Sequence, residues 1–176
     1  MVKGSKFRAV PELIWDDKMQ CYKVPLTKGQ FALISKEDKG KIEGIRWYCL
    51  SSGYAKNDNV GSMHQVILPP EKGMHIDHKN LNKLDNRREN LRQCLLCQNR
   101  YNYAAHRNSA SSMYKGVSWN KKRKRWVVYI AYKGRDYNLG RFQSEDDAAR
   151  AYNKKAAELF GEFAYLNKIP DWAGVC

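Results

Sequence analysis

The stretch over residues 74–102, MHIDHKNLNKLDNRRENLRQCLLCQNRYN, constrains the fold of this chain more than any other segment. It predicts an apolar-alternating strand that ends on Asp77 and His78, then a polar loop and a short second strand near residues 90–93. A segment of helical character that carries Asn99 follows. Strand, loop, strand and helix would form one compact unit. This unit presents a carboxylate, an imidazole and the carboxamides of Asn90 and Asn99.

These side chains suit the metal-dependent hydrolysis of a phosphodiester. The reaction needs an activated water, and a hard divalent cation with oxygen ligands can neutralise the phosphate and stabilise the leaving 3′ oxygen. Asp77 and Asn99 are the candidate metal ligands, and His78 titrates near neutrality, as a general base must. Asn90 has the length to hold the imidazole in one orientation. Neighbours on a strand point to opposite faces, so Asp77 and His78 would need a bulge or a pleat edge to approach one phosphate.

The DH pair, the phrase LDNRRENLR at residues 84–92 and the QNRYN at residues 98–102 resemble the HNH nuclease family, in its phage and group I intron homing branch. The resemblance implies that Asp77 and Asn99 bind Mg²⁺ or Mn²⁺, that His78 is the general base and that Asn90 positions it. It also implies products with 5′-phosphate and 3′-hydroxyl ends. A single site in a monomer would favour nicking, whereas a homodimer could cut both strands. The alternative is a DNA-binding regulator whose nuclease unit is inactive.

The charge of the chain favours a polyanionic partner. Lys and Arg number 32 against 18 Asp and Glu, which gives a net charge of +14. The largest surplus, 12 basic against 6 acidic residues, lies in residues 114–167. A basic surface attracts phosphate regardless of base sequence, so double-stranded DNA is the expected partner. No apolar run approaches the length of a membrane span, and residues 1–15 show no signal-peptide pattern, so a cytoplasmic location is expected.

The five cysteines are odd in number and unevenly spaced, which favours reduced thiols over a disulfide framework. Cys94 and Cys97 form a C-x-x-C that could be half of a zinc site. A structural zinc site needs four ligands, and His75 or His106 would have to replace a second cysteine pair. Zinc is therefore unlikely, and the sequence predicts that Cys94 and Cys97 are small buried residues at the joint between strand and helix.

Residues 1–68 are predicted to be β-rich and to pack on the nuclease unit. Residues 23–26 and 30–35 predict a hairpin, and a helix is expected to start near Ser35 and continue through Ile45. His64 is assigned to packing or to a phosphate contact rather than to catalysis. Further strands are expected over residues 47–50, 54–56 and 63–68. The nuclease unit is expected over residues 69–102, with a linker over residues 103–113.

Residues 114–167 predict a second domain, followed by a tail over residues 168–176. Three antiparallel strands are expected over residues 115–119, 125–133 and 135–142. A helix capped by Ser144 should follow and end near Gly161. The phrases KGV, LGRF, AARAY and the final LN resemble the APETALA-two or ethylene-response-factor DNA-binding domain. The chain as a whole is thus expected to be α+β, with a β-rich part on a ββα-metal unit and then a three-stranded sheet with one packed helix.

That resemblance implies that the exposed face of the sheet enters the major groove, for which a narrow ribbon is suited. Alternation places Trp126, Val128, Ile130 and Tyr132 toward the core. Several base-reading positions of the plant pattern carry Ser118, Asn120, Asp136 and Asn138 here, so the target sequence should differ. The basic turn between the first two strands could also be simply solvated. The candidate DNA-binding residues are Lys115, Ser118, Asn120, Lys122, Arg123, Arg125, Tyr129 and Lys133.

Overall fold

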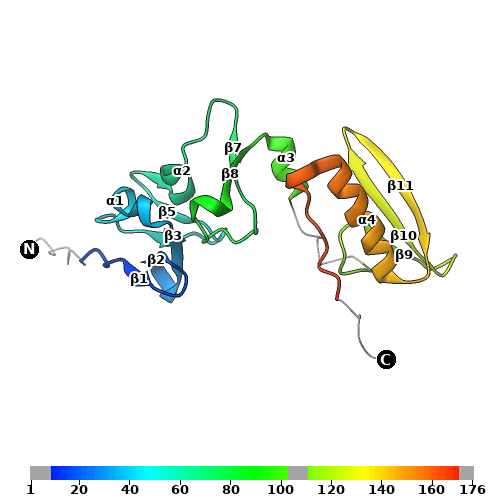
Figure 1. Cartoon of the computed structure of the whole chain (residues 1–176), viewed down its shortest axis with the longest axis horizontal. Helices are drawn as coiled ribbons and strands as arrows, with labels where there is room; N and C mark the ends of the chain where they lie inside the picture. Colours follow the sequence, from blue (N-terminus) through cyan, green and yellow to red (C-terminus); the bar gives the residue numbers. More distant parts are fainter. Residues whose placement is uncertain (1–8, 103–110, 171–176) are drawn as a thin grey trace, which may run out of the picture. The chain divides into compact units, whose positions relative to one another are not determined.

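The computed structural model describes residues 9–102 and 111–170. The chain divides between Leu96 and Cys97 into two compact units, called here the N-terminal and the C-terminal unit (Figure 1). Both combine small antiparallel sheets with helices, which confirms the α+β class. Within the described ranges, no helix is both long and apolar enough to cross a membrane. Most of the predicted linker, residues 103–110, and residues 171–176 of the predicted tail lie outside the described residues.

The N-terminal unit begins with an antiparallel meander whose strand order is β1-β2-β3. The predicted hairpin is confirmed, because β2 pairs with β3. Val24, Ala32 and Ile34 project from these strands into the core and are at most 2% exposed. The strands are β1 (Ile14–Asp16), β2 (Cys21–Pro25) and β3 (Phe31–Ile34).

The next segment holds a short helix and a second small sheet. A 3₁₀ turn at Lys36–Asp38 leads into α1 (Lys39–Ile42), which is shorter than the predicted helix because Glu43 is already extended and Gly44 has φ +76°. The predicted strand over residues 47–50 is present in shorter form, and the strand predicted over residues 54–56 is shifted by one residue. They are β4 (Tyr48–Cys49) and β5 (Ala55–Asn57), joined by β6 (Gly61–Ser62).

The strand predicted over residues 63–68 is wrong, because Met63–Ile67 form the helix α2. Met63, His64 and Ile67 are the buried residues of this helix, and Ile67 lies three and four positions after the other two, spacings that share a helical face. A short apolar run fits a buried strand and a buried helix equally well, so the sequence pattern alone did not separate them.

The predicted strand, loop, strand and helix over residues 74–102 are confirmed. β7 (His75–His78) pairs antiparallel with β8 (Leu91–Cys94), and α3 (Leu96–Tyr101) follows. The loop between the strands is attached to β3, since the Leu33 amide donates to Leu84 O and the Asn86 amide donates to Leu33 O, both at 2.8 Å. Ile76 and Leu91 join the same core as Trp47. The β-rich part therefore packs on the hairpin, as expected.

The C-terminal unit is a three-stranded antiparallel sheet with α4 across one face (Figure 1). Its elements are β9 (Val117–Asn120), β10 (Arg125–Tyr132), β11 (Arg135–Phe142) and α4 (Glu145–Phe160), as the sequence predicts. Ser144 Oγ accepts a hydrogen bond from the Asp147 amide at 3.3 Å, so the predicted N-cap is confirmed. The helix ends at Gly161, whose φ of +53° stops it.

Close packing of α4 on the sheet depends on small residues. Ala148, Ala149 and Ala156 are fully buried beside Val128, and Tyr152 is 2% exposed. Gly116 lies just before β9 with φ +78°, and a Cβ added there would lie 2.2 Å from the Tyr152 ring. The glycine of the KGV phrase is therefore required both by its backbone conformation and by the aromatic ring packed on it.

Candidate active site

The hairpin of β7 and β8 places Asp77 and His78 side by side in a regular register. Asp77 lies opposite Arg92 and His78 lies opposite Leu91, with no bulge in this pairing. The two side chains therefore leave the strand on opposite faces. Both are nearly buried, with 5% of Asp77 and 4% of His78 exposed.

The Asp77 carboxylate forms an ion pair with Arg92 across the hairpin. Arg92 Nε and one terminal nitrogen donate to Oδ2 of Asp77 at 2.9 and 2.7 Å. Only 9% of the Arg92 side chain is exposed. Arg92 has no assigned role in the sequence analysis, although the cross-strand register of the two predicted strands could have revealed this contact.

His78 is hydrogen-bonded to Asn86 in the buried interior. His78 Nε2 lies 3.1 Å from Asn86 Oδ1, and Asn86 is 0% exposed. The side-chain nitrogen of Asn86, Nδ2, donates to Leu84 O at 3.3 Å and to Met63 Sδ at 3.5 Å. Its oxygen is thus the atom that faces the imidazole, and since a carboxamide oxygen only accepts, Nε2 carries the hydrogen. In neutral His78 the lone pair then lies on Nδ1.

Asn90 holds the loop in this structure and makes its side-chain hydrogen bonds to the backbone. Asn90 Nδ2 donates to Asp85 O at 2.7 Å, and Asn90 Oδ1 accepts from the Asn80 amide at 3.0 Å. These bonds fasten both ends of the polar loop to the start of β8. Asp85 also stabilises this loop, because Arg87 donates two 2.8 Å hydrogen bonds to its carboxylate. The carboxamide in contact with His78 is that of Asn86.

Two further rings pack against His78. The His64 ring centroid lies 5.2 Å from that of His78, and the Tyr54 centroid lies 5.9 Å away. His64 is 9% exposed, and in the described part of the chain its Nδ1 has no hydrogen-bond partner. His64 therefore packs against His78, which is one of the two roles expected for it, and a phosphate contact stays a prediction.

Burial controls the titration of both imidazoles. Desolvation, followed by the nearby His78, lowers the pKa of His64 to about 4. Desolvation also lowers the pKa of His78 below its ordinary value, although the hydrogen bond to Asn86 and the charge of Asp77 act in the opposite direction. At neutral pH both rings are therefore uncharged, and His78 can accept a proton.

Asn99 lies on α3, beyond the division between the two units, and is half-buried. Asn99 therefore belongs to the C-terminal unit, whereas Asp77 belongs to the N-terminal unit. Across residues 9–102 and 111–170, no three His, Cys, Asp or Glu side chains gather into a metal-binding group. A carboxylate and a carboxamide are nevertheless oxygen donors suited to a hard cation that keeps several waters.

The two cysteines of the C-x-x-C have different surroundings. Cys94 is fully buried in β8, and its thiol lies 3.5 Å from His75 O. Cys97, on α3, is exposed, so the prediction that both are buried is wrong for Cys97. The physical reason is that β8 ends at Cys94, and the short helix that follows turns Cys97 outward.

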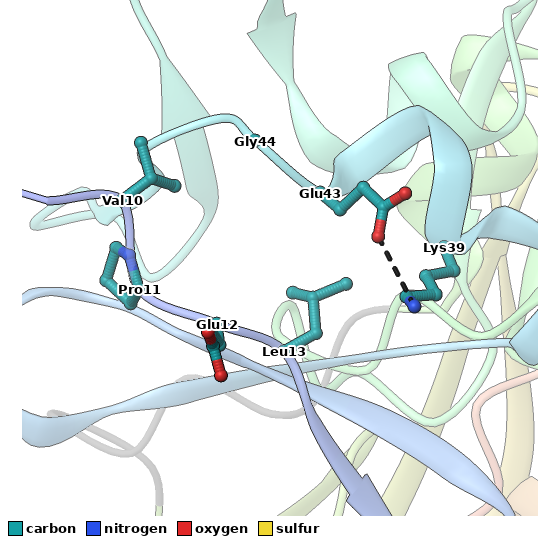
Figure 2. Close-up of a pocket in the computed structure, with 7 residues that line it drawn as sticks. All are labelled: Val10, Pro11, Glu12, Leu13, Lys39, Glu43 and Gly44. Carbon is teal, nitrogen blue, oxygen red and sulfur yellow. Dashed lines mark ion pairs between the residues drawn. The ribbon is translucent and has the colours of Figure 1, made fainter.

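The cavity in Figure 2 lies elsewhere in the N-terminal unit and contains none of the predicted site residues. It has a volume of about 520 Å³ and lies between the segment at Val10 and the end of α1. Among the described lining residues the one cation is Lys39, which pairs with Glu43 at 3.4 Å, as the dashed line shows. The candidate active site is thus the surface of the hairpin and its loop rather than a deep pocket.

The outer face of the C-terminal sheet brings several of the predicted DNA-binding residues together. Cross-strand pairs place Arg125 beside Asn120, and Tyr129 beside Asn138. Ser118 and Arg141 lie opposite Val127 from the two flanking strands. Arg141, which is exposed, is absent from the predicted set, although the alternation of β11 could have indicated it.

The remaining predicted DNA-binding residues lie in turns or on the other side of the sheet. Lys122 and Arg123 are exposed in the β9–β10 turn, where the Arg123 amide donates to Asn120 Oδ1 at 3.0 Å. Lys115 Nζ donates to Tyr101 O at 2.7 Å, and Tyr101 stacks on Phe160 at the end of α4. Lys115 therefore lies on the helix-covered side. The Lys133 ammonium lies 5.3 Å from the Tyr132 ring centroid.

Comparison with known proteins places the hairpin in a described family. Residues 69–100 match the family described as HNH endonuclease, and this range includes β7, β8 and Asn99. Over 152 residues the chain is 33% identical to an uncharacterized HNH endonuclease, L560, of Acanthamoeba polyphaga mimivirus, covering 81% of this chain and 77% of the relative. It is also 33% identical over 98 residues to Protein 3.8 of Escherichia phage T7, covering 54% of this chain and 78% of that protein. No solved structure matches the chain.

Proposed function

The chain belongs to the HNH endonuclease family, and from this premise we propose that it hydrolyses DNA phosphodiesters with a divalent metal ion, His78 being the general base. The observation that carries the proposal is the buried hydrogen bond from His78 Nε2 to Asn86, at the strand position that follows Asp77. It fixes the ring in one tautomer, so that Nδ1 of a neutral imidazole is the basic atom.

The reaction can be divided among residues of this chain. His78 Nδ1 takes a proton from the attacking water, and Asn86 holds the ring and stabilises its Nε2–H form. Asp77 and Asn99 are the residues that would hold Mg²⁺ or Mn²⁺, through a carboxylate and a carboxamide oxygen. When bound, the cation supplies neutralisation of the scissile phosphate and stabilisation of the leaving 3′ oxygen. Arg92 orients Asp77 through hydrogen bonds that end on Oδ2.

The C-terminal unit is proposed to place the nuclease on duplex DNA. Helix α4 covers one face of its sheet, so the outer face with Arg125, Tyr129 and Arg141 is the one that is open to a DNA duplex. A three-stranded ribbon of this kind is narrow enough for the major groove, and arginines contact both phosphates and base edges. The homing type and the APETALA-two likeness are proposals supported by the motifs of the sequence.

The test is cleavage of supercoiled plasmid in Mg²⁺, in Mn²⁺ and in EDTA. We expect nicked or linear product with metal and none with EDTA, and the ratio of nicked to linear product distinguishes nicking from double-strand cutting. Asp77→Asn should abolish cleavage while DNA binding persists. The control is Glu12→Gln, which makes the same chemical change at an exposed carboxylate in the cavity of Figure 2. Cleavage by folded Asp77→Asn at the parent rate would contradict the proposed role of Asp77.

A further inference from the structure

A second cavity, of about 460 Å³, lies within the C-terminal unit. It is enclosed by the end of α3, the residue before Gly116, the β10–β11 turn and the inner side of α4. The volume lies in the range of sites that hold small organic ligands. The lining residues that matter to its chemistry are Arg100, Tyr101, Lys115, Tyr132, Lys133 and Phe160.

The cavity is strongly cationic. Arg100, Lys115 and Lys133 all line it, and none of the described lining residues is a carboxylate. Within the residues that the structure describes, none of the three cations has an ion-pair partner. The cavity of Figure 2 differs in this respect, because Lys39 there is paired with Glu43.

Lys115 is the most informative of the three cations, because it is partly withdrawn from water. Its ammonium donates to Tyr101 O at 2.7 Å and lies 5.6 Å from the Tyr165 ring centroid. Burial lowers its pKa to about 8, since desolvation penalises the charged form. A desolvated ammonium without a carboxylate is stabilised when an anion enters beside it.

Aromatic rings supply the second part of the recognition surface. Tyr101 stacks on Phe160 with ring centroids 4.1 Å apart, and the Tyr132 ring lies 5.8 Å from Phe160. Tyr101 and Tyr132 are only half-buried and line the cavity together. Such rings give a flat surface on which a nucleobase can stack, whatever its identity.

We propose that this cavity binds a nucleotide, with Arg100, Lys115 and Lys133 contacting the phosphate and Tyr101 or Tyr132 the base. A phosphate alone would not use the rings, and an uncharged aromatic ligand would not use the cations. The same chemistry is offered by a free deoxynucleoside monophosphate and by the 5′-phosphorylated end of a DNA strand. This site lies apart from the sheet face that we propose for duplex DNA.

The test is calorimetric titration of the full chain in EDTA, where no cleavage can interfere. The ligands are deoxyadenosine monophosphate, deoxyadenosine and inorganic phosphate. We expect the nucleotide to bind about tenfold or more tightly than either of its parts. Arg100→Gln should weaken the nucleotide by about tenfold, and Lys133→Gln should act in the same direction. Lys154→Gln, which removes an exposed charge of α4 that does not line the cavity, should leave binding unchanged.

Equal affinity for deoxyadenosine and its monophosphate would overturn the proposal. So would an equal loss of binding in Lys154→Gln and Arg100→Gln, because that result would indicate a diffuse charge effect. Short single-stranded oligonucleotides with a 5′-phosphate or a 5′-hydroxyl then distinguish the two sources. If only the 5′-phosphorylated oligonucleotide competes with deoxyadenosine monophosphate, the ligand of the cavity is a strand end. If neither oligonucleotide competes, the ligand is a free nucleotide. These measurements do not depend on nuclease activity.

Discussion

At the residue scale, Asn86 explains why His78 can act as a base although it is buried. A buried hydrogen bond to Asn86 fixes the imidazole, and the other contacts of Asn86 leave its oxygen a single orientation. His78 thereby keeps one tautomer, and its basic nitrogen is defined before the substrate arrives.

Asn86→Ala should lower kcat/KM for DNA cleavage by about 10- to 100-fold, because the imidazole loses its preferred tautomer and orientation. The Asn86 hydrogen bond raises the pKa of His78, so its loss should move the acid limb of the pH–rate profile to lower pH. The rate of the folded fraction is measured by single-turnover cleavage from pH 5 to 9.

Asn90→Ala is the matched control, because Asn90 bonds to the loop backbone rather than to His78. It should lower the free energy of unfolding by about 1–3 kcal/mol and leave the acid limb in place. A shift of the limb in Asn90→Ala but not in Asn86→Ala would return the positioning role to Asn90.

His64 predicts a loss of stability in acid. Its pKa is about 4 in the folded chain against about 6.5 when unfolded, so the unfolded state binds more protons between these values. Its contribution is complete above pH 6.5 and is lost as pH falls toward 4, by about 3 kcal/mol in all. His64→Leu should flatten this part of the curve in urea unfolding, and exposed His75→Leu should not. An unchanged slope in His64→Leu would show that other groups cause the acid loss.

At the element scale, the packing of α4 on the sheet depends on Gly116. Gly116→Ala should cost about 3 kcal/mol or more of stability, because its Cβ would meet the Tyr152 ring and the backbone has positive φ. Gly134→Ala has a similar φ of +74° with nothing within 4 Å, so it should cost only about 1 kcal/mol. Thermal unfolding of the two variants measures the difference, and equal costs would argue against the ring contact.

The sequence predicts an element best where the hydrophobic pattern agrees with a capping residue or a turn residue at its end. β7 ends at His78 as expected, and the Ser144 cap and Gly161 stop define α4. The prediction of a strand at Met63–Ile67 is wrong, because the apolar run of a buried five-residue helix is as short as that of a strand. Asn86 was part of a recognised phrase but had no role, since its contact with His78 depends on how the loop folds back. Arg141 has no predicted role either, although the alternation of β11 could have placed it on the outer face.

At the scale of the whole molecule, the net charge of +14 makes affinity for DNA depend on salt. Arg125→Gln with Arg141→Gln should reduce the slope of log affinity against log salt by about two, one for each phosphate contact. Lys154→Gln, exposed on α4 away from the outer face, should change the slope little. Gel-shift titrations at salt concentrations of about 50 to 200 mM provide the measurement. Equal slopes in all variants would exclude the outer face as the duplex contact.

The most direct test of the central claim is single-turnover cleavage by His78→Ala in Mg²⁺, with and without free imidazole. If His78 is the general base, the variant should bind DNA normally, cleave at least about 100-fold more slowly and regain part of its rate with imidazole. Cleavage by His78→Ala at the parent rate would contradict the account, because the activated water would then have another base.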